Sequence, residues 1–358
     1  MSRPARALIN TAALKHNLDI VRQFAPDSNV MAVVKANAYG HGLVTAAKAL
    51  SNANEYGVAS IDEALALREV GISCPITALT GFFNAEEIPL FVLHQITAVI
   101  HSRWQVQALE SVSQSGRIKV WLKVDTGMNR LGIKPANFDS VLERLRRCEL
   151  VSEIGLLSHL ARADEIESDV TGEQIQNFKQ LTERCEAPRS LANSAGIAAW
   201  PESHGDIVRP GIMLYGSSPL TTKTAAELGL RPVMTVQSKL ITINQQQKGD
   251  AIGYGGDWRC PEDMAVGVVA FGYGDGYPRH APGGTPVIVN GARVPLVGRV
   301  SMDMIMVDLR NVKATVGDEV ELWGSNLSVD EVARCADTIS YELLCHVTER
   351  VPRSSIET

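Results

Sequence analysis

The sequence predicts an α/β protein: an N-terminal (β/α)8 barrel of the TIM type followed by a smaller, mostly β C-terminal domain. Before about Leu228, short apolar runs alternate with segments of helical period, as in parallel strands covered by helices. After it the helical period fades, and short strand-like runs are separated by Gly, Pro and Asn. We therefore expect a barrel domain at residues 1–228 and a β domain at residues 229–358.

Eight apolar runs are expected to form the barrel. Several are rich in β-branched residues and nearly continuous, which is typical of strands buried on both faces. Eight strand–helix repeats favour a closed barrel over an open sheet. The expected strands lie at residues 29–35, 56–60, 75–79, 96–101, 119–125, 153–160, 189–194 and 206–214.

Capping residues mark helix boundaries between these strands. A small polar residue followed three positions later by Glu or Gln is typical of a helix N-terminus. The three pairs are Ser60 with Glu63, Asn84 with Glu87, and Thr171 with Gln174. Gly71 is expected to end the first of these helices.

The C-terminal domain is expected to hold one helix, at residues 329–336, capped by Ser328. Apart from this helix, the domain is expected to consist of strands joined by turns. Its strands are expected at residues 233–244, 265–271, 286–289, 293–297, 305–309 and 319–322.

Composition argues against several classes of protein. Hydrophobic residues make up 45% and charged residues 21%, which predicts a folded chain rather than a disordered one. The net charge of -6 argues against nucleic-acid binding, and no apolar run approaches the ~20 residues of a membrane span. The N-terminus lacks the pattern of a secretory signal, and the six cysteines contain no C-x-x-C pair. We therefore expect a cytoplasmic protein with free thiols and no metal site.

Lys35 stands out because it directly follows the apolar run Met-Ala-Val-Val at the C-terminal end of the first barrel strand. Barrels hold their chemistry at this end of the strands. Position alone leaves two interpretations open: a rim lysine that extends to solvent, or a desolvated amine of lowered pKa that forms a Schiff base. Tyr39 follows in the same loop between small residues, where a phenol and the backbone can approach a phosphate.

The segment around Lys35 resembles the pyridoxal-phosphate lysine segment of bacterial alanine racemases, which are fold-type III enzymes. Each further matching segment is weak alone, but their order and spacing over essentially the whole chain are specific. The resemblance implies a homodimer that interconverts L-alanine and D-alanine through a Schiff base of pyridoxal 5'-phosphate, supplying peptidoglycan synthesis or alanine catabolism. The matching segments lie at residues 123–132, 158–160, 193–196, 208–216, 252–258, 272–279 and 297–304.

The resemblance assigns the cofactor contacts to the barrel rim. It implies that Arg209 faces the pyridine nitrogen, where a guanidinium leaves that nitrogen unprotonated and the ring a weaker electron sink, and that His159 supports Arg209. The residues implied at the phosphate are Tyr39, Ser194, Gly211 and Ile212. Without the resemblance, these patterns equally fit a salt-bridged arginine, a core histidine and a serine helix cap.

Racemisation needs a base on each face of the substrate Cα. The resemblance implies that Lys35 serves one face and Tyr254 serves the other. Tyr254 lies in the β domain, so the two bases are expected to meet across a head-to-tail dimer interface, with each site completed by the partner chain. An isolated Gly-Tyr-Gly is otherwise typical of a β-turn.

The remaining implied contacts concern the substrate. Arg130 is expected to bind its carboxylate together with the backbone N–H of Met302 from the partner chain, and Tyr273 to narrow the entrance for a methyl-sized side chain. Lys123 matches a family lysine that is often carbamylated and orients Arg130. Glu349 stands where many relatives have a tyrosine at the phosphate, which predicts a lost contact and a wider entrance.

Two other functions are weighed. A fold-type III decarboxylase normally places a carboxylate at the pyridine nitrogen, so Arg209 and Tyr254 argue against it. A non-enzymatic pyridoxal-phosphate carrier would be a lone barrel, which the β domain after Leu228 contradicts.

Overall fold

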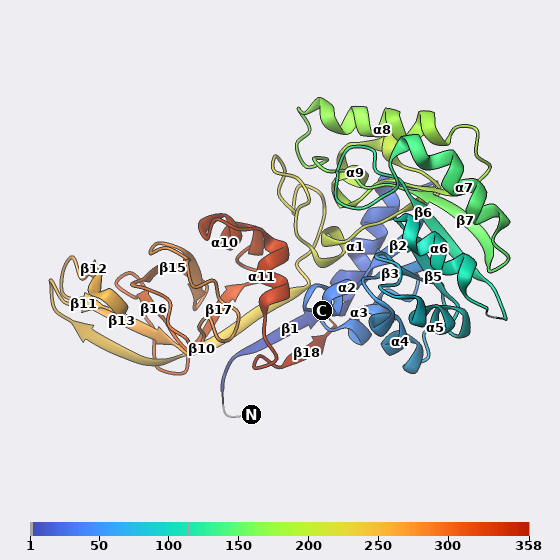
Figure 1. Cartoon of the computed structure of the whole chain (residues 1–358). Helices are drawn as coiled ribbons and strands as arrows, with labels where there is room; N and C mark the ends of the chain where they lie inside the picture. Colours follow the sequence, from blue (N-terminus) through green and yellow to red (C-terminus); the bar gives the residue numbers. More distant parts are fainter. Residues whose placement is uncertain (1–2, 114, 358) are drawn as a thin grey trace.

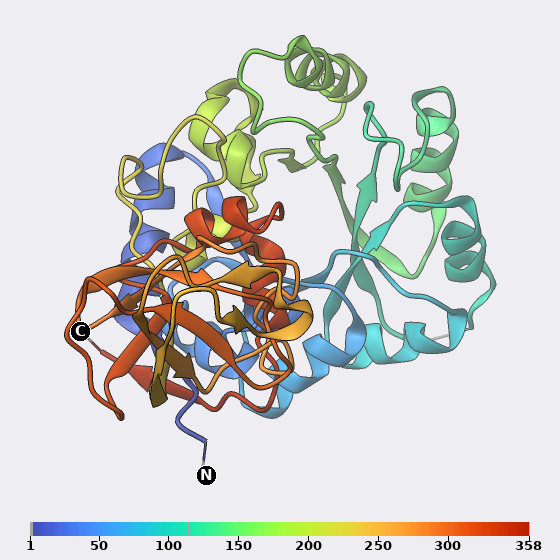
Figure 2. The same cartoon turned by 90° about the vertical axis from the view of Figure 1, so that its left-hand side faces the viewer.

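The computed structural model describes residues 3–113 and 115–357, and it places two sheets at opposite ends of an elongated molecule (Figure 1). The barrel lies at one end, and the β domain extends away from it. Figure 2 shows the same molecule along its length, with the β domain in front of the barrel and the helices around the barrel strands. None of the helices in the described residues is long and apolar enough to cross a membrane.

The first sheet has eight strands, each paired in parallel with its neighbours, in the order β8-β7-β6-β5-β4-β3-β2-β9. A parallel bridge between Asn193 and Arg209 joins its two ends. The predicted barrel is therefore confirmed, and each strand lies within or beside an expected run. The strands are β2 (Asn29–Val33), β3 (Glu55–Val58), β4 (Ile76–Ala78), β5 (Ile96–Ile100), β6 (Ile118–Lys123), β7 (Val151–Leu157), β8 (Arg189–Ser190) and β9 (Ile207–Val208).

Helices cover the outside of this barrel because each buries one apolar stripe against the strands. In α7, for example, Phe138, Val141, Leu142 and Leu145 are buried. The α-helices are α1 (Thr11–Phe24), α3 (Leu43–Ala49), α4 (Ile61–Glu69), α5 (Ile88–Leu93), α6 (Arg103–Ser111), α7 (Phe138–Arg147), α8 (Asp169–Thr182) and α9 (Ser194–Ala199). Short 3-10 turns are η1 (Ala85–Glu87), η2 (Pro135–Asn137), η3 (Pro201–Ser203), η4 (Ile212–Tyr215) and η5 (Tyr254–Gly256).

The predicted capping residues had mixed outcomes. Ser60 precedes α4 as expected, but its side chain makes no capping hydrogen bond. The prediction that Thr171 opens a helix is wrong: α8 begins at Asp169, and Thr171 is buried inside it. Gln174 instead accepts from the amide of Ala161 and donates to the carbonyl of His159, so it fixes a loop at the barrel rim.

The second sheet forms the β domain. Its order is β13-β16-β15-β14-β17-β10-β1-β18, and an additional β13–β10 pairing closes six of these strands on themselves. The long strand β10 closes the ring because it pairs with β17 along one part of its length and with β13 along another. The strands are β1 (Arg6–Asn10), β10 (Met234–Gln246), β13 (Met264–Val269), β14 (Pro286–Val289), β15 (Ala292–Val297), β16 (Ile305–Asp308), β17 (Glu319–Trp323) and β18 (Arg353–Ile356), with a separate ribbon of β11 (Ala251–Ile252) and β12 (Trp258–Arg259).

Several features of this region differ from expectation, among them the unpredicted strands β11, β12 and β18. The predicted helix is present as α10 (Val329–Cys335), and Ser328 accepts from the amide of Asp330, but α11 (Ser340–His346) is a second helix that we did not predict. Strand β1 belongs to the second sheet, where it pairs antiparallel with β10 and parallel with β18. The domain boundary between residues 228 and 229 stays a prediction. Strand β1 crosses it, because this N-terminal segment joins the sheet of the β domain.

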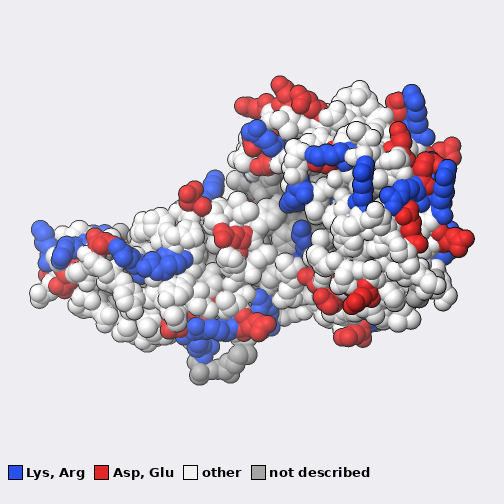
Figure 3. Space-filling model, viewed as in Figure 1, with Lys and Arg blue, Asp and Glu red and all other residues white. Residues whose placement is uncertain are grey.

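The surface carries both signs of charge on the face in Figure 3, with Lys and Arg side chains gathered along the β domain. Arginines of the β domain form ion pairs, as Arg299 does with Asp257 and Arg310 does with Glu262. All six cysteines are free thiols, and the described residues contain no cluster of side chains suited to a metal ion.

Candidate active site

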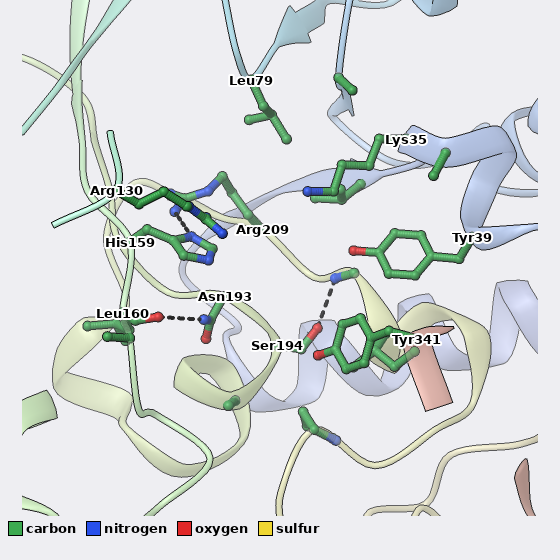
Figure 4. Close-up of a pocket in the computed structure, with 18 of the residues that line it drawn as sticks. Lys35, Tyr39, Leu79, Arg130, His159, Leu160, Asn193, Ser194, Arg209 and Tyr341 are labelled. Atoms are coloured by element: carbon green, nitrogen blue, oxygen red, sulfur yellow. Dashed lines mark hydrogen bonds between the residues drawn. The ribbon is translucent and has the colours of Figure 1, made fainter. Parts of the chain in front are cut away.

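A cavity of about 640 Å³ opens at the C-terminal ends of the barrel strands (Figure 4). Residues at or directly after the ends of six strands line it (β2, β3, β4, β6, β7 and β9), as is usual for active sites in this fold. The structure brings together every site residue that we predicted in the barrel. These residues are Lys35, Tyr39, Lys123, Arg130, His159, Ser194, Arg209, Gly211 and Ile212.

Lys35 is followed by a turn of unusual backbone geometry. The segment α2 (Lys35–Tyr39) is not a right-handed helix, because Ala36, Asn37, Ala38 and Tyr39 have φ between 51° and 54°. Left-handed conformations cost non-glycine residues about 1–2 kcal/mol each, so surrounding contacts must hold this turn. The turn lets both Lys35 and Tyr39 face the cavity (Figure 4).

Electrostatics favour an uncharged amine at Lys35. Burial lowers its pKa most, and the nearby positive charge of Arg130 lowers it further. Burial also lowers the pKa of Lys123 to about 8, aided by Arg209 and Arg130. The cavity thus holds four basic side chains, an arrangement suited to an anionic ligand.

Arg209 is buried without a carboxylate among its hydrogen-bond partners in the described residues. Its guanidinium donates to the hydroxyl of Ser190 at 2.6 Å and to the carbonyls of Ser158 and Leu191 at 2.6 and 3.2 Å. Burial lowers its pKa to about 10. The interpretation of an ordinary salt-bridged arginine is therefore wrong.

His159 lies beside this guanidinium, with Nδ1 at 3.4 Å from Nη2 of Arg209. Burial and the charge of Arg209 hold the pKa of His159 well below its usual value. The ring is therefore neutral at physiological pH, and its Nδ1 lone pair can accept from Arg209.

A cradle of small and hydroxyl groups lies across the cavity from this guanidinium. The Ser194 hydroxyl accepts from the amide of Gly211 at 2.8 Å and from that of Met213 at 3.4 Å. A Cβ on Gly211 would lie only 2.3 Å from the Tyr39 hydroxyl, so any larger residue there would have to displace the Tyr39 side chain. Asn193, not Ser194, caps α9, which leaves the Ser194 hydroxyl facing the cavity.

Arg130 stands on a loop that Asp125 holds in shape. The buried carboxylate accepts from the amides of Gly127 and Asn129 at 3.1 and 3.0 Å and pairs with Lys134 at 2.7 Å. These three contacts fix the loop that carries Arg130 over the cavity.

The unexpected helix α11 adds residues that sequence reasoning missed. Tyr341 and Cys345 both line the cavity, and the Tyr341 ring lies 5.9 Å from that of Tyr39. Glu349 is exposed and lies outside this lining. That Glu349 takes the place of a tyrosine, with a lost contact and a wider entrance, stays a prediction, and Tyr341 is the tyrosine that the structure places beside Tyr39. The sequence offered little sign of this role, because Tyr341 is a single tyrosine in the first turn of a helix that we had not predicted.

The β-domain residues of the predicted site lie elsewhere. Tyr254, Tyr273 and Met302 are 68%, 39% and 52% exposed, and none lines the barrel cavity. Tyr254 and Tyr273 share a shallow depression with Arg279 and Arg299. In Figure 1 the ribbon beside Tyr254 lies at the far end of the β domain. One chain alone therefore does not bring these residues to Lys35.

Two family models match the chain: "Alanine racemase, N-terminal domain" at residues 9–219 and "Alanine racemase, C-terminal domain" at residues 233–355. An alanine racemase of Nitrosococcus oceani is 53% identical over 98% of both chains, and one of Coxiella burnetii is 50% identical over 99% of both. The solved biosynthetic alanine racemase from Pseudomonas aeruginosa has a TM-score of 0.97 and 45% identity, covering 99% of this chain and 100% of its own. That from Acinetobacter baumannii has a TM-score of 0.95 and 40% identity, with the same coverage.

Proposed function

The chain belongs to the alanine racemase family and is an enzyme, and on that premise we propose that it racemises alanine with pyridoxal 5'-phosphate in the barrel cavity and two bases. One base is Lys35, and the other is Tyr254 of the partner subunit. The observation that carries the proposal is the placement of a desolvated amine, a buried guanidinium and a hydroxyl cradle around one cavity.

These residues fit pyridoxal 5'-phosphate. The Ser194 hydroxyl, the Gly211 amide region and the Tyr39 phenol would hold its phosphate. Burial raises the pKa of Tyr39, so its hydroxyl stays protonated and can donate a hydrogen bond. When bound, the cofactor would supply an electron sink that acidifies the α-hydrogen of an amino acid.

Lys35 would perform two tasks with its ε-amine. Because its pKa is lowered, a larger fraction of the amine is uncharged at neutral pH, the form that would hold the cofactor covalently. The same amine would then remove a proton from, or return one to, one face of the substrate Cα.

Arg209 would face the ring nitrogen. A guanidinium has no lone pair to offer as an acceptor, so it would keep that nitrogen unprotonated and weaken the electron sink. Its hydrogen bonds to Ser190 and Ser158 hold it in place. A weaker electron sink in the cofactor ring would limit side reactions such as transamination.

A homodimer would complete the site. Tyr254 and Met302 are exposed in one chain, as expected for residues that enter a neighbour's cavity. Arg130 would bind the substrate carboxylate, and Tyr273 of the partner subunit would restrict the entrance.

Lys123, with a pKa lowered to about 8, would present the uncharged amine that carbamylation needs, and the resulting anion would orient Arg130. The D-alanine formed would supply peptidoglycan synthesis or alanine catabolism.

Chiral chromatography of the full-length protein with pyridoxal 5'-phosphate and L-alanine tests the proposal. We expect D-alanine to form until both enantiomers are equal, and the reverse from D-alanine. Carbon dioxide release from a basic amino acid, without racemisation, would favour the decarboxylase. Cofactor binding with neither reaction would favour the carrier.

A further inference from the structure

Glu63 makes two backbone contacts that a helix capping box does not explain. It lies in the first turn of α4, and its Oε2 accepts from the amide of Ala59 at 2.8 Å. Its Oε1 accepts from the amide of Ala36 at 2.7 Å. The carboxylate therefore ties the end of β3 to the residue that directly follows Lys35.

Ala36 is the first residue of the left-handed turn. The far end of this turn is held separately, because the Nδ1 of His41 lies 3.0 Å from the carbonyl of Ala38 and 2.9 Å from that of Tyr39. Carbonyls only accept, so the imidazole donates there. The turn is thus fixed at its start by a carboxylate and at its end by an imidazole.

We propose that Glu63 is a positioning residue for Lys35, which fixes the start of the left-handed turn through the Ala36 amide and aims the amine into the cavity. The inference rests on the proposed function for the task that Lys35 performs. The contacts themselves are independent of that function.

The charge of Glu63 supports the same role. It raises the pKa of Lys35, against the lowering by burial and by the arginines. The carboxylate therefore partly offsets the lowering of the Lys35 pKa and favours the uptake of a proton, which a base needs during each turnover. The charged and titratable groups that interact with Lys35 include Arg130, Arg209, Lys123, His159, Cys345 and Glu63.

The chain offers a matched control in Glu87. Its carboxylate also accepts from a nearby backbone amide, that of Phe83 at 3.3 Å, and from the Asn84 side chain at 2.9 Å. Glu87 does not line the barrel cavity. It is therefore a glutamate in a similar local role, away from Lys35.

Two rates measured on the full-length chain without cofactor test the proposal in Glu63→Gln, Glu63→Asp and Glu87→Gln. The first is acetylation of Lys35 by trace acetic anhydride across a pH series, followed by peptide mass spectrometry. The second is capture of pyridoxal 5'-phosphate on Lys35, trapped by borohydride. Thermal unfolding of each variant checks that it is folded.

In Glu63→Gln we expect the acetylation midpoint to fall by roughly half a pH unit, since the carboxylate no longer opposes the arginines. Glu63→Asp keeps the charge, so its midpoint should stay closer to that of the parent. Both variants should slow capture by roughly three- to tenfold, the effect of one lost hydrogen bond. Glu87→Gln should change neither rate.

Unchanged capture in both Glu63 variants would overturn the proposal, as would an equal loss in Glu87→Gln. Neither rate requires racemisation. A parent chain that captures the cofactor on Lys35 but racemises nothing would therefore overturn the proposed function alone, and the variant rates would still decide the role of Glu63.

Discussion

The barrel half and the β-domain half of the proposed site differ in how complete they are within one chain. In the barrel, nine predicted residues surround one cavity, and buried contacts such as those of Arg209 fix them. In the β domain, Tyr254 and Met302 are exposed and face no cavity of that size. If the proposed function holds, the difference predicts that the barrel would bind the cofactor before assembly, whereas the β domain would act only against the partner subunit.

The two segments that carry Tyr273 and Met302, at residues 272–275 and 301–303, form an exposed edge of the β domain that we call the lip. Hydrogen bonds and ion pairs nonetheless hold this lip in shape. The amide of Tyr273 donates to the carbonyl of Ser301 at 3.0 Å, and that of Gly274 donates to the carbonyl of Met302 at 2.8 Å. Behind them the fully buried carboxylate of Asp275 pairs with Arg3 at 2.7 Å and Arg350 at 3.3 Å. A surface so firmly supported suits docking into a partner with little rearrangement.

Removing the barrel base gives the largest expected effect. Lys35→Ala should lower racemisation by roughly 10⁴-fold or more, at the upper end of a general-base contribution, and abolish borohydride-trapped cofactor. Lys48→Ala, an exposed lysine of α3, serves as control and should behave as the parent. Trapped cofactor on another lysine would contradict the assignment.

Mixing two inactive variants tests whether the barrel half and the β-domain half of one site come from different chains. Lys35→Ala and Tyr254→Phe protomers, each inactive alone, should regain about a quarter of parental activity after subunit exchange at equal amounts. Half of the dimers are then hybrids, and each hybrid holds one intact site out of two. Hybrids that are demonstrated by mass spectrometry but stay inactive would place both bases on one chain.

Removing only the β-domain base should separate the two directions of proton exchange. If Tyr254 serves L-alanine and Lys35 serves D-alanine, Tyr254→Phe should still exchange the α-hydrogen of D-alanine with deuterated solvent. Exchange from L-alanine should fall by roughly 10²-fold, as followed by proton NMR. Equal residual exchange from both enantiomers would argue for a single base.

The smallest expected effect concerns the support of the lip. Asp275→Asn leaves the two arginines without their buried partner and should reduce the free energy of unfolding by about 1–3 kcal/mol, since the arginines are partly exposed. Glu262→Gln removes an exposed ion pair of the same domain and should cost about 0–1 kcal/mol. Urea unfolding measures both, and equal losses would show that burial of Asp275 adds nothing.

The sequence patterns predicted those strands and helices in which buried residues recur at a regular spacing. All eight barrel strands and the six expected strands of the β domain fall in apolar runs, where burial and period coincide. Strand β1 has only five residues and alternates between buried and half-buried positions, so its local signal is weak. It becomes a strand because β10 and β18, which are distant in sequence, flank it.

The site was predictable where a side chain follows a barrel strand, as Lys35 and Arg209 do. It was not predictable where tertiary packing decides. Tyr341 reaches the cavity because α11 packs beside the Lys35 turn, where the Gly40 position lies so close that a Cβ would meet the Leu344 carbonyl at 2.1 Å. The contacts of Glu63 also arise between loops, since its side chain reaches Ala36 rather than the amide of Ser60.

The pairing of β1 with β18 has a consequence for how the chain folds on the ribosome. The sheet of the β domain contains both the first and the last described strand, so it cannot be completed until β18 has been synthesised. The barrel strands, which lie between them in sequence, can pair earlier. During this interval β1 can pair with β10 but lacks its second neighbour β18, and completing the sheet joins strands that are more than 300 residues apart. Nascent chains stalled before Arg353 should therefore protect the barrel from proteolysis more strongly than β1, which then pairs on one side only.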